Sequence, residues 1–534
     1  MPAMPAKKFP PTARRLPYLC AALALVCGFT APISSFAEAP FSLASTPGKL
    51  PKDIIPLEYT VHLQPDIESN RFRGTQSVEI EVQRSTQKIV LNAFQLEIEE
   101  ASISGLGLPE QKLTPQLDAQ QQTLEFVLPQ RLVPGRYALK MQFRGRINRE
   151  GLGMFGLQYK VGELEKKMLA TTLEPSDARR ILPLWDEPAF RAKFTLSVDA
   201  PSKMQAFSNM PIVKKEALPD GMQRIWFATT PSMASYLLVL VVGEMERISA
   251  MQDGVEIGIV TTEGKLPSAQ FALDSSKDLL QYYNQYFGVH YPLPKLDQIA
   301  IPGGFHGAME NWGGIVYNEA VLLYLPNQSS EETKQDSFAV NAHEMAHQWF
   351  GDLVTMAWWD NLWLNEGFAS WMGTKATAHF HPEWRVWLQD LVGREKVMNL
   401  DAGASTHPIQ TPIVNEEQAA NAFDAITYGK GQAFLRMLEA YLGEAVFQRG
   451  MQTYMQKHQY SNTTSADLWQ ALASASGKPV AKIAADWTTQ PGLPLITVKQ
   501  SCQNGKRKIQ FAQQVFRLDG SHAKAQNWHI PLQF

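Results

Sequence analysis

Apolar and polar residues alternate in short segments between residues 57 and 245. The segments 59–63 and 78–82, for example, place an apolar residue at every second position. Because successive side chains of a strand point to opposite faces, this period of two predicts half-buried β-strands. The run YLLVLVVG at 236–243 is apolar throughout, so we expect a fully buried strand there. The pattern predicts an N-terminal, antiparallel β domain over residues 38–245.

The apolar spacing becomes helical from about residue 246 to residue 490. The run NEGFASWMGTKATAHF predicts a helix from about 362 to 380, and a second amphipathic stretch covers 424–457. We therefore expect a second domain over 246–490, built largely from helices.

The motif HEMAH at 343–347 has the residue types and the spacing of a catalytic zinc site. His343 and His347 share one helix face, and Glu344 projects near it, where a general base for an attacking water is needed. A catalytic zinc takes three protein ligands and leaves one position open. Glu366 follows His347 by nineteen positions, so this helix can end near Gly351 and the next can return a carboxylate to the metal. We predict one zinc ion per chain, bound by His343, His347 and Glu366.

Two plainer interpretations of this motif are weaker. A chance match on a buried helix would leave both histidines merely hydrogen-bonded, and the glutamate at 366 argues against that. A structural zinc site has four protein ligands and is usually rich in cysteine. The three cysteines of this chain all lie far from the motif.

Residues 303–317 read GGFHGAMENWGGIVY, and the order GAMEN, HEMAH and NEG resembles the aminopeptidase N family of zinc aminopeptidases, in the gluzincin clan. The resemblance extends from about Leu57 to the last residue. It implies a thermolysin-like α/β catalytic domain over 246–490. One position departs from the pattern, because many relatives carry glutamine where this chain has Thr172, which would alter a polar contact of the pocket for the first residue.

The resemblance also assigns roles outside the metal helix. Tyr428, in ITYGKG at 426–431, would be the tyrosine that stabilises the transition state. Glu174, in the segment 171–188, would join Glu310 as the pair of carboxylates that binds the substrate amine. The residues implied to bind substrate are Glu174, Gly307, Ala308, Met309, Glu310 and Asn311.

The chemistry of these groups fits an exopeptidase. Two carboxylates in a partly dehydrated cleft make charge-assisted hydrogen bonds to a free α-ammonium, which a blocked terminus cannot accept. Zinc would polarise the scissile carbonyl and lower the pKa of its water to about 7, while Glu344 would take the water proton. The Tyr428 hydroxyl would donate to the oxyanion. The sequence thus predicts a zinc aminopeptidase that acts on peptides with a free N-terminus.

Other interpretations of the site stay open at this point. A catalytically impaired fragment could act as a peptide-binding protein, although it would not need Glu344 beside the metal helix. A zinc epoxide hydrolase or endopeptidase could use the same scaffold, although GAMEN and Glu174 favour amine recognition. Asp352 and Asp360 are candidates to orient a ligating imidazole, and equally for a helix cap or a surface charge.

Residues 491–534 resemble the opening strands of the β-sandwich that follows the catalytic domain in this family. A sandwich takes about seven strands and about 100 residues, so these residues begin one without completing it. Apolar residues alternate from Trp528 to Phe534, which predicts a last strand with an unpaired edge. We expect an α+β multidomain fold with an incomplete C-terminal β-sandwich. We interpret the chain as a fragment of a longer protein, the alternative being a short form with an open site.

Charge and the first residues add two expectations. The net charge of −3, without a basic patch, argues against a nucleic-acid partner. Basic residues at 7, 8, 14 and 15 precede an apolar run over 16–29, and Ser35-Phe36-Ala37 fits a small-x-small cleavage site. Residues 1–37 are therefore predicted to be a signal peptide cleaved near Ala37, with export to the periplasm or beyond. No later stretch is long enough to span a membrane.

Overall fold

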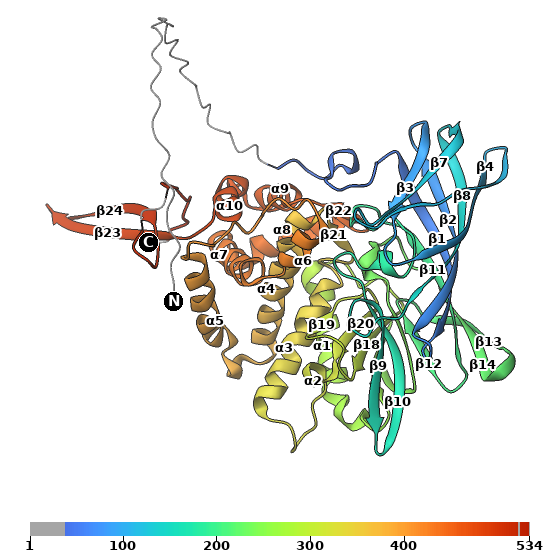
Figure 1. Cartoon of the computed structure of the whole chain (residues 1–534). Helices are drawn as coiled ribbons and strands as arrows, with labels where there is room; N and C mark the ends of the chain where they lie inside the picture. The colour runs from blue at the N-terminus through green and yellow to red at the C-terminus, as the bar shows by residue number, and fades with distance from the viewer. Residues whose placement is uncertain (1–37, 522–523, 533–534) are drawn as a thin grey trace, which may run out of the picture. The chain divides into compact units, whose positions relative to one another are not determined.

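Strands dominate the chain up to Thr262, and helices dominate it from Gln270 onward (Figure 1). The computed structural model describes residues 38–521 and 524–532, so the predicted signal peptide lies outside the described residues. The predicted start of the helical region at about residue 246 is wrong, because Met245–Gln252 and Val255–Thr262 form strands and the first long helix begins at Gln270. The predicted α+β organisation is nonetheless confirmed.

The largest sheet has eight strands in the order β13-β14-β11-β1-β2-β8-β4-β5. Its neighbours pair antiparallel, except β1 and β11, which run parallel. In β2, exposed or half-buried residues alternate with buried ones at every position, as a period of two requires. The strands are β1 (Ile54–Asp66), β2 (Arg71–Val82), β4 (Glu97–Gly105), β5 (Leu108–Lys112), β8 (Gly135–Arg146), β11 (Lys193–Pro201), β13 (Ile212–Ala217) and β14 (Met222–Phe227).

Two smaller sheets complete the strand-rich half, in the orders β3-β7-β6 and β12-β15-β10-β9. Their strands are β3 (Thr86–Asn92), β6 (Gln116–Asp118), β7 (Thr123–Leu132), β9 (Gly153–Val161), β10 (Leu164–Thr172), β12 (Gln205–Ser208) and β15 (Leu240–Gly243).

The apolar run 236–243 is buried throughout, as predicted, but only its last four residues form a strand. Ser235–Leu237 forms a 3-10 turn instead. Two side-chain hydrogen bonds account for the turn, because the Ser235 hydroxyl donates to Asp186 and the Tyr236 hydroxyl donates to the carbonyl of Gly351. Tertiary contacts thus override the local strand preference.

A five-stranded mixed sheet, β16-β17-β18-β20-β19, precedes and flanks the helices. Its inner strands β17, β18 and β20 are parallel, and the two edge strands pair antiparallel. Helix α1 packs against β16 and β17, and α3 packs against α4. The elements are β16 (Met245–Gln252), β17 (Val255–Thr262), α1 (Gln270–Phe287), β18 (Lys295–Ile301), β19 (Ala308–Met309), β20 (Gly314–Asn318), α2 (Glu319–Leu322), α3 (Glu331–His347) and α4 (Trp363–Phe380).

Strand β21 (Val354–Met356) lies between α3 and α4. The elements after α4 are α5 (Val386–Asp401), α6 (Glu416–Asn421), α7 (Gly431–Leu442), α8 (Glu444–His458), β22 (Ser461–Thr463), α9 (Ser465–Ser476) and α10 (Val480–Thr489). Strands β21 and β22 pair in parallel. Among the described residues, no helix has both the length and the apolar character needed to cross a membrane.

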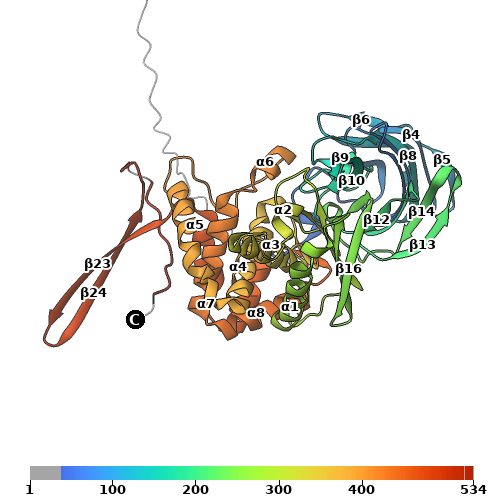
Figure 2. The same cartoon turned by 90° about the horizontal axis from the view of Figure 1, so that it is seen from below.

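A β-hairpin of β23 (Pro494–Gln503) and β24 (Lys506–Val515) projects from the helices (Figure 2). In the described part of the chain, these strands pair only with each other. The strand expected from Trp528 onward is wrong for the described residues to 532, which form none. The side-chain amide of Gln513 bonds both backbone polar groups of Trp528, in place of a strand partner, and the buried indole packs on Trp487.

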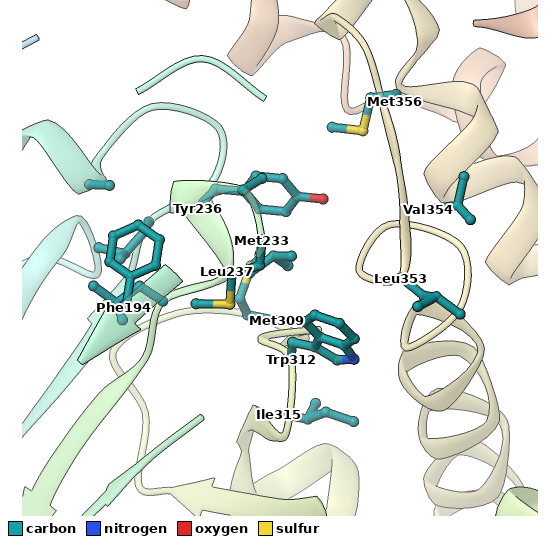
Figure 3. Packing of buried hydrophobic residues seen from close by; sticks show 14 of the residues in the cluster. Phe194, Met233, Tyr236, Leu237, Met309, Trp312, Ile315, Leu353, Val354 and Met356 are labelled. Atoms are coloured by element: carbon teal, nitrogen blue, oxygen red, sulfur yellow. The ribbon is translucent and has the colours of Figure 1, made fainter. Parts of the chain in front are cut away.

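One hydrophobic cluster runs through both halves of the described chain. Figure 3 shows part of it, with residues from the strand-rich half, from the region of β19 and β20, and from the segment after α3. The labelled side chains are Phe194, Met233, Tyr236, Leu237, Met309, Trp312, Ile315, Leu353, Val354 and Met356. The GAMEN segment therefore lies in a core shared with the strand-rich half and with the end of the HEMAH helix.

Candidate active site

The two histidines of HEMAH meet a glutamate from the next helix. The Nε2 atoms of His343 and His347 are 3.0 Å apart, and each lies 3.4 Å from Oε2 of Glu366. Helix α3 begins after Ser330, whose side chain accepts from the Thr333 amide. It ends at His347, four residues before the predicted end, because the chain turns through Gly351 at a φ of 126°.

A glycine in α4 lets the two helices approach closely. A Cβ at Gly373 would lie 3.0 Å from the backbone nitrogen of His343, so a larger residue would push the helices apart. The close approach brings the carboxylate of Glu366 to the histidine pair. The sequence spacing predicted that Glu366 would lie near the two histidines, and Gly373 allows the two helices to come close enough for this.

These three atoms fit a zinc ion. Zinc–nitrogen distances of 2.0–2.1 Å in a tetrahedron place neighbouring ligand atoms about 3.3 Å apart. The observed separations of 3.0 to 3.4 Å match that requirement. Oε2 of Glu366 is buried without a hydrogen bond from any described residue. Burial opposes its ionisation, but the nearby His347 and His343 lower the pKa of Glu366 to about 2, so the carboxylate is charged.

The GAMEN segment places a second buried carboxylate, Glu310, near His343, His347 and Glu366. Glu310 follows β19, and its backbone carbonyl accepts from Nε2 of Gln348, whose Oε1 in turn accepts from the Gly313 amide. The Asn311 amide donates to the carbonyls of Tyr236 and Leu238 in the strand-rich half, each at 3.4 Å. Asn311 thus lies against that half, and its role toward substrate stays a prediction.

The strand-rich half contributes Glu174, just after β10. Carboxylate oxygens of Glu174, Glu310 and Glu366 all lie within 4.8 Å of one another. Burial, followed by the charge of Glu310, raises the pKa of Glu174 well above its ordinary value. Burial raises the pKa of Glu344 in the same way. The largest charges that act on Glu174 are those of Glu310 and Glu366, followed by His347 and Glu344.

Tyr428 lies on a single turn of π-helix, Ile426–Lys430. Its ring is 6.2 Å from that of His343, with the two planes 15° apart. Burial and the charge of Glu366 raise the pKa of Tyr428 far above 10, so its hydroxyl keeps its proton at neutral pH. A Cβ at Gly367 of α4 would lie 3.1 Å from the Thr427 carbonyl, which shows how closely the turn packs.

Comparison with family models decides the relationship. A model described as the Peptidase M1 N-terminal domain matches residues 55–237, and one described as the Peptidase family M1 domain matches residues 271–487. The chain belongs to peptidase family M1. The resemblance inferred from GAMEN, HEMAH and NEG is thereby confirmed, and the M1 domain match contains all three motifs.

Curated M1 relatives align along most of this chain. Aminopeptidase M1-D of Oryza sativa subsp. japonica is 39% identical over 485 residues, which cover 91% of this chain and 55% of the relative. Aminopeptidase M1 of Arabidopsis thaliana is 38% identical, with coverages of 91% and 55%. The puromycin-sensitive aminopeptidase of Caenorhabditis elegans is 37% identical, with coverages of 91% and 52%. The chain spans about half the length of the curated relatives it matches.

One residue of this M1 site escaped the sequence analysis. Oδ1 of Asn365 lies 3.0 Å from Nδ1 of His347, which also faces the Phe350 carbonyl at 3.0 Å. Because both partners are acceptors, Nδ1 carries the proton and Nε2 offers its lone pair to the metal site. Nδ2 of Asn365 donates to Oε1 of Glu310 at 2.9 Å. Asn365 therefore links a predicted metal ligand, His347, to the GAMEN glutamate, and its place beside Glu366 was the only signal in the sequence.

The two aspartates expected beside the ligands take other positions. The Asp360 carboxylate accepts from the Asn361 side chain at 3.0 Å, and Asp352 makes no side-chain hydrogen bond with any described residue. Burial raises the pKa of Asp352 well above its ordinary value. The interpretation of either as the partner of an imidazole is wrong, since Asn365 holds that place at His347. The Thr172 hydroxyl is likewise buried without a described partner.

Proposed function

We propose that this protein is a zinc aminopeptidase, which hydrolyses the N-terminal peptide bond of peptides with a free α-amine. One observation carries the proposal, namely that Glu174 and Glu310 converge on the predicted ligand Glu366. A cluster of buried carboxylates is costly unless it is paired, so this arrangement favours a bound cation. The names of the relatives, all aminopeptidases, support the same activity.

His343, His347 and Glu366 would hold one zinc ion. When bound, zinc polarises the scissile carbonyl and lowers the pKa of a water molecule to about 7. Glu344 is buried one residue from the first ligand, where its carboxylate takes the proton of the attacking water and passes it to the leaving amine. The protonated Tyr428 hydroxyl donates to the oxygen that gains negative charge, an interaction that strengthens only in the transition state.

The position of the amine sets which bond is cut. Glu174 and Glu310 are held by different halves of the chain, and both lie beside the metal ligands. An α-ammonium bound between them leaves room for a single residue before the scissile carbonyl. A peptide with a blocked terminus loses these charge-assisted hydrogen bonds, so the site acts as an exopeptidase.

A panel of aminoacyl anilides tests the proposal with the purified protein. We expect release of the chromophore, loss of release after zinc chelation, and recovery when zinc is restored. N-acetylated versions of the same anilides should stay intact. Cleavage of acetylated peptides at internal bonds would instead identify an endopeptidase, and absence of turnover in folded, zinc-loaded protein would overturn the proposal.

We also propose that the protein is exported. The support is the sequence of residues 7–37, with its basic residues, apolar run and small-x-small site. N-terminal sequencing of the protein from cell fractions tests this, with Glu38 expected as the first residue of an exported form. A cytosolic product that keeps residues 1–37 would contradict it.

A further inference from the structure

The turn that carries Tyr428 is tied down by one aspartate. Oδ1 of Asp424 accepts from the amides of Ile426 at 2.9 Å and Thr427 at 3.0 Å. The backbone carbonyl of Asp424 accepts from the Tyr428 amide at 3.1 Å. Three consecutive amides at the start of the π-turn are therefore bound by a single residue. Turns of π-helix are rare and are found mostly at functional sites.

A histidine holds this aspartate in place. Nε2 of His407 lies 2.5 Å from Oδ2 of Asp424, and Nδ1 of His407 lies 2.7 Å from the carbonyl of Pro408. Both ring nitrogens are engaged, so the ring cannot rotate without losing a partner. The second carboxylate oxygen of Asp424 is thus fixed while the first binds the turn.

Helices α4 and α5 pack against only part of the π-helical turn. Thr427 approaches Gly367 of α4, and a Cβ at Gly429 would lie 2.7 Å from the side chain of Val397 in α5. A cavity of about 290 Å³ adjoins the turn elsewhere, and both His407 and Thr427 line it. On the cavity side, the bonds from Asp424 and His407 replace packed side chains.

We propose that Asp424 and His407 form a positioning clamp, which sets the Tyr428 hydroxyl where the oxyanion develops. The inference rests on the proposed function, since it assigns Tyr428 the role given above. Neither clamp residue needs to contact substrate. Loss of the clamp would let the turn relax and would move the hydroxyl, and a donor outside about 2.7–3.1 Å of the oxyanion stabilises it poorly.

A double-mutant cycle distinguishes positioning from general support of the fold. Removal of one oxyanion donor costs about 10²- to 10³-fold in kcat, which we expect for Tyr428→Phe. Asp424→Ala should lower kcat by roughly tenfold to a hundredfold with little change in KM, since it displaces that donor without removing it. If Asp424 acts through Tyr428, the double variant should be no slower than Tyr428→Phe alone.

Conservative variants refine the test. Asp424→Asn keeps an oxygen that accepts from both amides, so it should recover most of the activity that Asp424→Ala loses. His407→Ala should cause a smaller loss of kcat than Asp424→Ala, because the bonds to the turn remain. Zinc content and thermal melting, measured for every variant, identify any that fail to fold.

The chain offers matched controls for both bonds. Asp118 binds the amides of Gln120 and Gln121 at 2.9 Å, in the same two-amide pattern as Asp424. His529 pairs with Asp486 at 2.5 Å, as His407 does with Asp424. Asp118→Ala and His529→Ala should leave kcat unchanged.

The outcomes separate the two proposals. If the wild-type protein has no aminopeptidase activity, the proposed function itself fails. If the wild type is active and folded Asp424→Ala keeps full kcat, the clamp alone is overturned. Multiplicative losses in the double variant would also overturn it, since they mean that Asp424 acts independently of Tyr428.

Discussion

Buried carboxylates in two regions of this molecule have opposite electrostatic surroundings. On the eight-stranded sheet, Asp199 accepts from Arg224 at 2.6 and 2.9 Å and from Gln64 at 2.9 Å. Near the HEMAH helix, Glu174, Glu310 and Glu366 lie together, and the largest charges acting on Glu174 are those of the two other carboxylates. Asp199 is paired with an arginine, whereas Glu174 has like charges as its strongest charged neighbours.

The pKa values record this difference. Burial opposes the charge of Asp199, but the hydrogen bonds from Arg224 and Gln64 outweigh it and lower the pKa of the carboxyl. For Glu174, burial and the neighbouring carboxylates act in the same direction and raise the pKa. Unpaired buried carboxylates cost stability. In the proposed function, a zinc ion and a substrate ammonium would supply the missing positive charge.

The largest effect is expected for Glu344→Gln, which removes the proposed general base and keeps the three predicted metal ligands. Glu344→Gln should lower kcat by about 10²- to 10⁴-fold, the range for loss of a general base. Zinc content should stay at the wild-type level, since the three predicted ligands remain. Metal analysis beside single-turnover kinetics checks both quantities, and substantial activity in the zinc-loaded variant would refute the role of Glu344.

The next largest effect is expected from Asn365, whose side chain contacts both His347 and Glu310. Asn365→Ala removes the acceptor at Nδ1 of His347 and the donor to Glu310, and loss of such an outer partner lowers metal affinity by roughly tenfold to a hundredfold. Competition with a chromogenic chelator measures the affinity. An unchanged zinc affinity would show that the Phe350 carbonyl orients His347 without help.

A substitution at Glu174 should lower activity without lowering stability. Glu174→Gln replaces the carboxylate proposed to bind the ammonium with a neutral amide, so kcat/KM for peptides should fall about tenfold, as expected when a charged hydrogen bond becomes neutral. The melting temperature of the metal-free variant should stay level or rise, because repulsion among the carboxylates decreases. A clear loss of stability would contradict our description of this cluster as incomplete.

A substitution at Asp199 should lower stability without lowering activity, and its effect should be the smallest of the four. Asp199→Asn should leave kcat/KM unchanged and lower the unfolding free energy by about 1 kcal/mol or less, because the pair is partly exposed. The folded pKa lies below the ordinary 3.8, so this stability is present above about pH 4 and is lost as the pH falls through the folded pKa. Urea unfolding at several pH values checks the loss, and a difference that persists in strong acid would refute the ion pair as its source.

The convergence of His343, His347 and Glu366 was predictable because helix periodicity converts spacing directly into a shared face. His343 and His347 lie together for that reason, and α4 begins at Trp363, one residue after the predicted start. The link through Asn365 was not predictable. A Cβ at Gly351 would lie 2.2 Å from Oδ1 of Asn365, so the contact depends on a turn that no periodic pattern describes.

Misplaced elements have a similar cause. The apolar run at 236–243 begins with a turn held by Asp186 and Gly351, and the alternation after Trp528 forms no strand in the described residues because Gln513 takes its backbone bonds. In each case the deciding bond joins residues that no local apolar pattern relates. Local patterns predict which residues are buried, as they do at 236–243, better than they predict how the backbone is bonded.

The shared core has a consequence for attempts to recombine this protein with its relatives. The main hydrophobic cluster includes residues from Leu50 to Ala484, and a second one joins Phe155 and Val241 to Ile299 and Val316. An exchange of either matched segment would cut through both clusters. A functional chimera would therefore have to exchange sets of packed neighbours, and crossover points chosen at the boundaries of the matched segments would separate side chains that must be inherited together.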